Sequence, residues 1–445
     1  MLINKNVLTI EEDGRQLKFF SIVISKFFET LFINVLAMVT SVMLSGYTDA
    51  AVTVANLSTQ VINLVLIFLE MTTVGAVIHM SMEMGRGERK RVGELAGTAM
   101  VMLLIAAVIS GFGLILSAKW VMRLMNADNE ILVEAATYLR IMAIFLPTTV
   151  LMRCFNYFLI CNGYAHYTLA SGVLYNLINV FVCYYVLYGN FHLPVSPIYG
   201  VAAGNGIACV CGLIFSAVVY IKKKCPFTFC FRGHLLKSIL KMGVPGGMNG
   251  FNYNLAQTVT TALIASLGMT VFNTKIYISS IIVFSSVISF AISQAEAVFA
   301  GRYRGMEDFE SMNILHRQNL FMAVGANIVV SSIVFLCRRH LLGLFTDDAQ
   351  IIAFAGKIML FDIAVQIFRA VNQVSDQALN ANGDVKTTFL VSVCSCWTGS
   401  VMLSWLLGIR LGLGLLGVWL AFLFDEAFKS LIYTIRWKNG KWKYN

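Results

Sequence analysis

Charged side chains inside long apolar runs are the first candidates for chemistry in this sequence. Seven acids and six bases lie within such runs. A charge near the middle of a bilayer costs roughly 3 kcal/mol on insertion scales, so each one marks either a functional site or a structural ion pair. The acids that could carry a proton or bind a coupling ion are Glu29, Glu70, Asp362 and Asp376.

Two of these carboxylates lie in the first two apolar runs. Lys26 and Glu29 are three residues apart, which makes them neighbours on one helix face. This pair is either a titratable carboxylate tuned by the lysine or a structural ion pair, and both interpretations stay open. Glu70 has no base close to it in sequence, so it either pairs with a residue of another helix or carries a proton.

The tenth run carries one polar face. Arg369, Asn372 and Asp376 stand at positions i, i+3 and i+7 of a helix. Asp362 lies seven residues before the arginine, on a similar face. Arg369 could bind an anionic substrate group, because a guanidinium suits bidentate recognition of a carboxylate. Alternatively, Asp376, Asp362 or Glu70 neutralises it and the pair only locks the helices together.

The fourth run repeats part of this pattern. Arg153 and Asn156 have the same spacing as the arginine and asparagine of the tenth run. Two arginines in equivalent helices would point to one central cavity that binds substrate. The same two interpretations, anion binding or a structural ion pair, apply to Arg153.

The start of the seventh run is unusually polar. Its amides Asn249, Asn252, Asn254 and Gln257 could hold a substrate or a sodium ion, or they could join neighbouring helices. Tyr253 adds an aromatic surface that suits flat lipophilic compounds. The predicted substrate cavity is therefore lined by Lys26, Arg153, Asn156, Asn249, Tyr253, Asn254, Gln257, Arg369 and Asn372.

The remaining charges fit structural roles. Asp425 and Lys429 are an i, i+4 pair beside Glu426, and Glu296 is expected to reach the membrane surface. The sequence has no GxxxxGK[ST], no HExxH and no CxxC motif, so it predicts no nucleotide, zinc or redox chemistry. We therefore predict no catalytic residues, no metal site, no cofactor beyond a transported H⁺ or Na⁺, and no enzyme activity.

Composition and run length predict a membrane protein. The chain has 445 residues, of which 58% are hydrophobic and 13% charged, whereas soluble proteins carry about 25% charged residues. A helix needs about 20 apolar residues to cross a bilayer. Twelve runs meet this requirement, near 19–44, 51–79, 94–117, 134–160, 167–189, 199–221, 242–267, 275–300, 318–337, 350–379, 388–409 and 413–435.

The basic residues predict the orientation of these spans. With the N-terminus inside the cell, the cytosolic segments hold 21 Lys and Arg, the outer loops hold 6 and the spans hold 6, which accounts for all 33. Such a bias is the signature of cytosolic loops. We predict a multi-pass protein of the cytoplasmic (inner) membrane with both termini cytosolic. Its net charge of +10 then reflects topology rather than nucleic-acid binding.

The longest hydrophilic stretch divides the spans six and six. The predicted domains are an N-terminal six-helix bundle at 1–221, a basic linker at 222–241, a C-terminal bundle at 242–437 and a tail at 438–445. Matching patterns in the two halves predict a parallel pseudo-twofold repeat. The predicted fold is an all-α integral membrane protein of twelve transmembrane helices. The matching patterns are Gly204-x-x-x-Ala208 with Gly417-x-x-x-Ala421, Arg153-x-x-Asn156 with Arg369-x-x-Asn372, and Asn162-Gly163 with Asn382-Gly383.

Four motifs in the expected order resemble the multidrug and toxic compound extrusion (MATE) family. They are the charged turn MEMGRGERKRVGELAG (82–97), echoed by AGRYRGMEDFESM (300–312), then LKMGVPGGMNG (240–250), ALNANGDVKTT (378–388) and the last span from LGLLGVWLAF to RWKNGKW (413–442). The resemblance implies alternating access between two bundles and multidrug or toxin efflux by a proton or sodium antiporter. It also implies a small organic substrate, cationic or amphipathic, in contact with membrane lipid, with no nucleic acid and no obligatory protein partner.

The sequence departs from the family at its usual coupling acids. Those positions read Ser41, Tyr253 and Arg369 here, which puts the family's ion-coupling scheme in doubt for this chain. A flippase for a lipid-linked oligosaccharide, of the same broad superfamily, is the alternative function. A membrane enzyme acting on lipid or a non-transporting scaffold fits the sequence less well.

Overall fold

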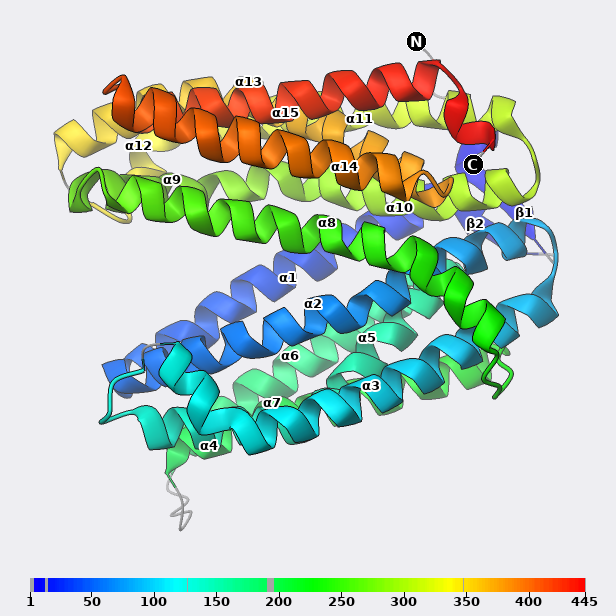
Figure 1. Cartoon of the computed structure of the whole chain (residues 1–445), viewed down its shortest axis with the longest axis horizontal. Coiled ribbons are helices and arrows are strands. Elements are labelled where there is room, and N and C mark those ends of the chain that lie inside the picture. Colours follow the sequence, from blue (N-terminus) through cyan, green and yellow to red (C-terminus); the bar gives the residue numbers. More distant parts are fainter. Residues whose placement is uncertain (1–3, 13–14, 126, 190–195, 347, 445) are drawn as a thin grey trace. The chain divides into compact units, whose positions relative to one another are not determined.

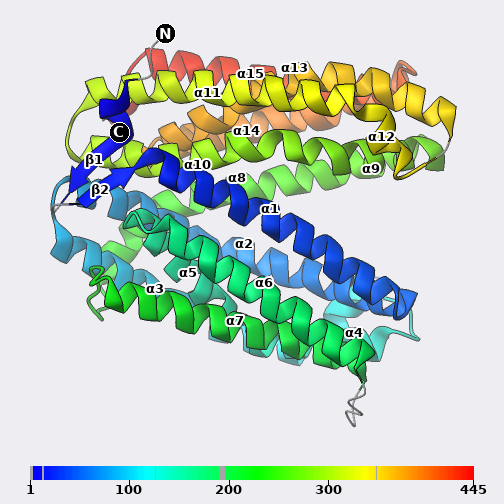
Figure 2. The same cartoon turned by 180° about the vertical axis from the view of Figure 1, so that it is seen from behind.

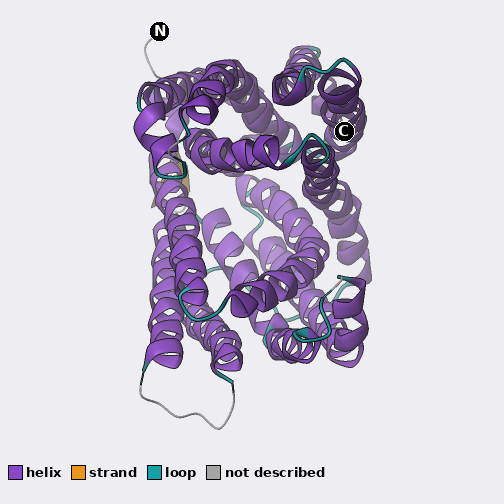
Figure 3. Cartoon of the chain, turned by 90° about the vertical axis from the view of Figure 1, so that its left-hand side faces the viewer, coloured by secondary structure: helices purple, strands orange, loops and turns teal. Residues whose placement is uncertain are grey.

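The structure is a computed structural model that describes residues 4–12, 15–125, 127–189, 196–346 and 348–444. Helices make up nearly all of the described chain (Figure 3). They form two compact units: an N-terminal unit of residues 28–247, and a C-terminal unit of residues 248–445 together with 1–27. The predicted all-α architecture of two bundles is confirmed.

The N-terminal unit is built from seven helices that form six spans. Helices α4 and α5 meet at a 48° bend and make one broken span, where the sequence predicted a continuous helix. Pro147 lies in the first turn of α5, where its missing N–H is tolerated but prevents continuation from α4. The helices are α1 (Phe19–Ser45), α2 (Asp49–Gly85), α3 (Arg89–Leu124), α4 (Leu132–Ile144), α5 (Leu146–Cys161), α6 (Ala165–Tyr188) and α7 (Pro197–Lys222).

The C-terminal unit supplies the other six spans, two of them composite. Helices α9 and α10 join through a short 3₁₀ turn, η2, and α14 continues into a π-helix, η3. Helices α11, α13 and α15 lie side by side in Figures 1 and 2. The elements are α8 (Gly233–Ala265), α9 (Met269–Ile282), η2 (Val283–Ser286), α10 (Val287–Gly305), α11 (Phe309–Leu336), α12 (Arg338–Gly343), α13 (Ala349–Ala381), α14 (Val385–Ser395), η3 (Cys396–Arg410) and α15 (Gly414–Lys438).

Length and composition alone indicate that most of these helices are membrane spans. Within the described residues, eight helices are long and apolar enough to cross a membrane, and the bent pair α4–α5 makes nine. The other three spans are α1, α8 and α15. Helix α8 contains Pro245 and several amides, and α15 carries three charged residues within two turns. Polar side chains thus lower the mean hydropathy of α8 and α15.

The two halves repeat one turn in detail. The side-chain amide of Asn162 donates to the carbonyl four residues earlier at 2.8 Å, and Asn382 does the same at 2.7 Å. The glycines that follow, Gly163 and Gly383, have φ values of 81° and 84°, in the left-handed region that glycine adopts without steric cost. The offset is 382 − 162 = 220 residues. The sequence echo therefore corresponds to the same backbone turn in both units.

The N-terminal segment packs on the C-terminal unit. A 3₁₀ turn, η1 (Lys5–Leu8), precedes a hairpin of β1 (Thr9–Glu12) and β2 (Arg15–Lys18), and a last 3₁₀ turn, η4 (Lys441–Tyr444), ends the described chain. The hydroxyl of Tyr303 donates to the Val7 carbonyl at 3.0 Å, and the rings of Phe19 and Phe299 lie 5.4 Å apart.

The boundaries of the units differ from the predicted domain boundaries. Residues 1–27 belong with the C-terminal helices because of the packing just described, whereas the sequence placed them with 28–221. The predicted linker 222–241 is only partly a loop, since α8 already begins at Gly233. Both α1 and α8 contribute residues to both units.

Candidate substrate and ion-coupling sites

An ion pair lies at the middle of the N-terminal unit. Nη1 of Arg153, on α5, donates to Oε1 of Glu70, on α2, at 2.6 Å. This confirms the predicted contact of Glu70 with another helix. The side chains remain 42% and 23% exposed, so the pair is accessible rather than enclosed.

Several neutral groups surround this pair. The Ser216 hydroxyl donates to Oδ1 of Asn156 at 2.7 Å, and Thr168 donates to Glu29 at 3.1 Å. Sequence reasoning missed the serine and threonine, because a hydroxyl inside an apolar run gives no distinct signal. Helices α5, α6 and α7 pack against one another here (Figure 2). We call this group the N-terminal polar cluster: Glu29, Glu70, Arg153, Asn156, Tyr157, Thr168, Tyr175, Asn205 and Ser216.

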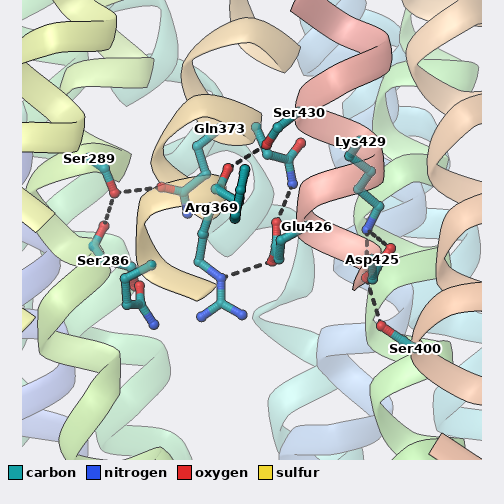
Figure 4. Close-up of polar contacts among 12 residues, drawn as sticks. Ser286, Ser289, Arg369, Gln373, Ser400, Asp425, Glu426, Lys429 and Ser430 are labelled. Atoms are coloured by element: carbon teal, nitrogen blue, oxygen red, sulfur yellow. Dashed lines mark hydrogen bonds and ion pairs between the residues drawn. The ribbon is translucent and has the colours of Figure 1, made fainter. Parts of the chain in front are cut away.

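The C-terminal unit holds a second, more enclosed arginine. Nε of Arg369, on α13, donates to Glu426 of α15 at 2.9 Å, and Asn372 donates to the other oxygen of Glu426 at 2.7 Å. Figure 4 shows Arg369 and Glu426 facing each other. The sequence offered Asp376, Asp362 or Glu70 as partners of the two arginines; the Arg153–Glu70 pair confirms one of these, whereas Arg369 forms its ion pair with Glu426 instead. Glu426 is the partner because α13 and α15 pack along their lengths. The spacing of residues within α13 does not reveal this packing.

The predicted pair Asp425–Lys429 is confirmed, with a separation of 2.9 Å. Both side chains are at most 4% exposed, and Asp425 also accepts a hydrogen bond from Ser400 at 2.6 Å (Figure 4). Lys429 donates to the sulfur of Cys396 at 3.1 Å. The π-helix η3 supplies both the serine and the cysteine. A buried pair with this many partners serves structure, since each charge is fully satisfied.

Two carboxylates in the same unit are held by neutral groups. Asp362 accepts hydrogen bonds from Gln366 and from the Trp419 indole, both at 3.1 Å. Asp376 accepts from Asn249 at 3.2 Å and from Asn380 at 3.1 Å. Among the described residues, neither carboxylate forms an ion pair with a basic side chain.

The charge balance of this region follows from these contacts. The described residues of this region include four acids, Asp362, Asp376, Asp425 and Glu426, and two bases. Glu426 forms an ion pair with Arg369, and Asp425 forms one with Lys429. Asp362 is only 3% exposed, and an isolated buried carboxylate is costly unless it is neutralised. Protonation or a bound cation would neutralise Asp362 and Asp376. We call the set Asn249, Asp362, Gln366, Arg369, Asn372, Asp376, Asn380, Trp419, Asp425, Glu426 and Lys429 the C-terminal polar cluster.

Some polar residues at the start of the seventh span take part in these interactions, and others join neighbouring helices or bond within their own helix. Asn252 is buried and accepts from the Trp397 indole at 3.0 Å, whereas Asn254 bonds to a carbonyl of its own helix. Tyr253 is 37% exposed, and the Lys429 ammonium lies 5.9 Å from its ring centroid. Of the other predicted cavity residues, Gln257 is half-buried on α8 and Lys26 belongs to the C-terminal unit.

The position of Glu296 differs from the predicted one. Glu296 was expected to reach the membrane surface, but its side chain is fully buried. It bonds to Nδ1 of His316 at 2.7 Å and to the amide of Asn319, and the Trp437 ring packs on the histidine at 4.1 Å. The partners come from the next helix and from α15, so sequence spacing gave no sign of them.

Comparison with known proteins identifies the family. The MatE family model matches residues 26–185 and 245–406 of this chain. The chain belongs to the MATE family of transporters. This membership agrees with the resemblance seen in the motifs and with the repeated turns of the two units.

Relatives of this MATE protein cover nearly its whole length. An uncharacterized transporter, YisQ of Bacillus subtilis, is 28% identical over 412 residues, which are 90% of this chain and 90% of that protein. A probable multidrug resistance protein, NorM of Thermotoga maritima, is 24% identical over 413 residues, 91% of this chain and 88% of that protein.

Solved structures share the fold of this MATE chain. The outward-facing conformation of a multidrug resistance MATE transporter of the MOP superfamily aligns with a TM-score of 0.88 at 16% identity, covering 96% of both chains. A MOP superfamily transporter of Pyrococcus furiosus, described as having a binding pocket of reverse polarity that suggests a different function, aligns with a TM-score of 0.86 at 15% identity, again over 96% of both.

The departures from the family's acidic positions bear on coupling. Tyr253 and Arg369 stand at two of those positions. Both belong to the C-terminal unit, where Arg369 forms an ion pair with Glu426. The third position, Ser41, lies among the side chains that the structure does not describe. Two of the predicted acids, Asp362 and Asp376, lie on α13 in the same unit as Tyr253 and Arg369.

Proposed function

We propose that this protein exports organic compounds by alternating access, as an antiporter driven by proton or sodium entry, with Asp362 and Asp376 as the coupling groups. The observation that carries this proposal is that both carboxylates lie inside a span and are held only by neutral donors. A carboxylate that is already paired with arginine or lysine gains little from a proton. One that is held by amides and an indole can bind a proton or cation and release it again.

The relatives support the broader part of the proposal. Several are probable multidrug resistance proteins of bacteria, which favours a small organic substrate and a place in the cytoplasmic membrane with both termini cytosolic. The flippase alternative would need a cavity lined with free cations for a pyrophosphate. Arg369 is enclosed and paired with Glu426, so of the two arginines predicted for that role only Arg153 keeps exposed donors, which is fewer cations than a pyrophosphate needs.

The test is efflux from proteoliposomes loaded with a cationic dye such as ethidium. Efflux driven by an imposed pH gradient is compared with efflux driven by a sodium gradient, for the wild type, Asp362→Asn and Asp376→Asn. We expect efflux that follows one gradient and falls at least tenfold in one or both variants. Glu310→Gln, at an exposed acid in the first turn of α11, is the control and should keep wild-type efflux. Gradient-driven efflux that survives in both aspartate variants would contradict the assigned coupling groups.

A further inference from the structure

We propose that Arg153 recognises a carboxylate on the transported compound, so that the substrate class includes organic anions with an aromatic or amphipathic body. The inference rests on the proposed export function and adds a substrate class to it. The proposed site lies wholly within the N-terminal unit, on α2, α5, α6 and α7.

The first support is the unused donor capacity of Arg153. A guanidinium has five N–H donors on three nitrogens, and only Nη1 donates within the described residues, to Glu70. The side chain is 42% exposed. By contrast, the side chain of Arg369 is 19% exposed, and its glutamate is also bonded by Asn372. Arg153 therefore still offers donors to a ligand, and Arg369 is enclosed.

The second support is the depth of this exposed charge. Arg153 lies inside the broken span formed by α4 and α5, eight residues before its end at Cys161, and Glu70 lies near the middle of the 37-residue helix α2. A guanidinium at that depth does not face lipid, because the cost would be several kcal/mol. The exposed donors must therefore face water or a bound polar group. A carboxylate is the group whose two oxygens match two parallel guanidinium N–H bonds.

The third support is the set of neighbours. Tyr157, on α5, and Tyr175, on α6, lie near Arg153, and Tyr175 donates to Asn205 of α7 at 3.4 Å. Aromatic rings with polar tips suit a ligand that has a flat apolar body and one anionic group. Among the described residues, Glu70 is the acid that forms an ion pair with Arg153.

Glu70 acts as a positioning residue in this arrangement. Its carboxylate holds the guanidinium by one nitrogen and leaves the other edge open. The same carboxylate also repels an incoming anion. Neutralising Glu70 should therefore raise the affinity for an anionic ligand, while a purely structural ion pair would lose stability and gain no affinity.

The test measures binding of two dyes that differ in one group. Fluorescein and its methyl ester share the ring system, and only fluorescein carries the free carboxylate. Binding is followed by fluorescence anisotropy on the full-length protein in detergent, without any gradient. We expect fluorescein to bind about tenfold more tightly than the ester, since a hydrogen bond to a charged group supports such a ratio. Arg153→Gln should reduce that ratio to about one, and Glu70→Gln should increase it.

Two further variants separate recognition from folding. Arg153→Lys keeps the charge but loses the planar fork, so it should retain only part of the preference. The double variant Arg153→Gln with Glu70→Gln removes both charges together, which avoids a lone charge in the span. It should melt near the wild-type temperature and show no preference. Arg140→Gln is the charge-matched control, because Arg140 on α4 bonds to the Ile115 carbonyl, away from the cluster. It should keep the wild-type ratio.

The results that would overturn the inference are specific. Equal affinity for the two dyes in the wild type would do so, as would an unchanged ratio in the double variant. Failure of the proposed function looks different, because it is the absence of gradient-driven efflux in proteoliposomes. A carboxylate preference in detergent without any efflux would uphold the binding site and reject the transport proposal.

Discussion

The N-terminal and C-terminal polar clusters each contain an arginine on the fourth span of its half, one helical turn apart relative to the repeated Asn-Gly turn, and the two arginines are paired differently. Arg153 and Arg369 are separated by 369 − 153 = 216 residues and lie on the fourth and tenth spans. The first pairs with Glu70 of the second span, and the second pairs with Glu426 of the last span. Each half therefore carries an arginine on its fourth span, and the partner helix decides whether that arginine stays accessible or becomes enclosed.

Under the two proposals above, this difference would give the units separate tasks. The exposed pair of the N-terminal unit leaves donors for a ligand, whereas in the described part of the chain Asp362 and Asp376 are held by neutral hydrogen-bond donors. A duplicated unit would then bind substrate in one half and a coupling ion in the other without any change of fold.

The largest expected effect comes from removing the enclosed arginine. Arg369→Gln leaves Glu426, 5% exposed, without its cation, and breaking a buried pair in this way costs about 3–5 kcal/mol. Arg153→Gln should cost only about 1 kcal/mol or less, because its pair is accessible. Thermal unfolding of the two purified variants in the same detergent measures the contrast. Equal losses of stability would remove the distinction between the two clusters.

A second contrast uses the glycines of the repeated Gly-x-x-x-Ala motif. A Cβ on Gly417 would lie 2.6 Å from the backbone of Leu407, whereas a Cβ on Gly204 would lie 2.6 Å from a methyl group of Val182. Backbone moves less easily than a side chain. Gly417→Ala should therefore lower stability by about 2 kcal/mol.

Gly204→Ala should lower stability by about half as much, since the added methyl group meets only side-chain atoms of Val182 and no backbone. The melting temperatures of the two alanine variants test this order. Gly113→Ala is the control, because nothing lies within 4 Å of its added methyl group. A larger loss in Gly204→Ala than in Gly417→Ala would show that the two interfaces pack differently from the structure.

The smallest effect concerns the turns after the second and eighth spans. Gly87 has a φ of 77°, and Glu307, 220 residues later, has a φ of 60°. A non-glycine residue in this region is strained by about 1 kcal/mol. Glu307→Gly should therefore raise stability slightly and Gly87→Ala should lower it by a similar amount, as followed by chemical or thermal unfolding. Changes of the same sign in both variants would contradict the equivalence of the turns.

The sequence predicted the architecture because its signals are local. Runs of about 20 apolar residues, the basic bias of the cytosolic loops and repeated Asn-Gly turns each depend on neighbours in the chain. Spacing of four residues also predicted the contact of Asp425 with Lys429. The break at Pro147 is a local signal too, and it was overlooked within a long apolar run.

The partners across helices were harder to predict. Arg369 lies one turn or two from acids of its own helix, yet it pairs with Glu426, and Glu296 pairs with His316 instead of reaching the surface. Such choices depend on which helices pack together and at which rotation. The spacing of residues in a single sequence does not reveal which helices pack together. The packing of residues 1–27 on the C-terminal unit is a contact of the same kind.

The most direct test of the division of tasks is ion release on substrate binding. Purified protein in weakly buffered detergent solution, with a pH indicator and a sodium electrode, is titrated with a transported dye. We predict that binding releases protons or sodium from the wild type and from Glu70→Gln, and that release disappears in the double variant Asp362→Asn with Asp376→Asn although the dye still binds. Release that disappears in Glu70→Gln and persists in the double aspartate variant would place coupling in the N-terminal unit and contradict the account.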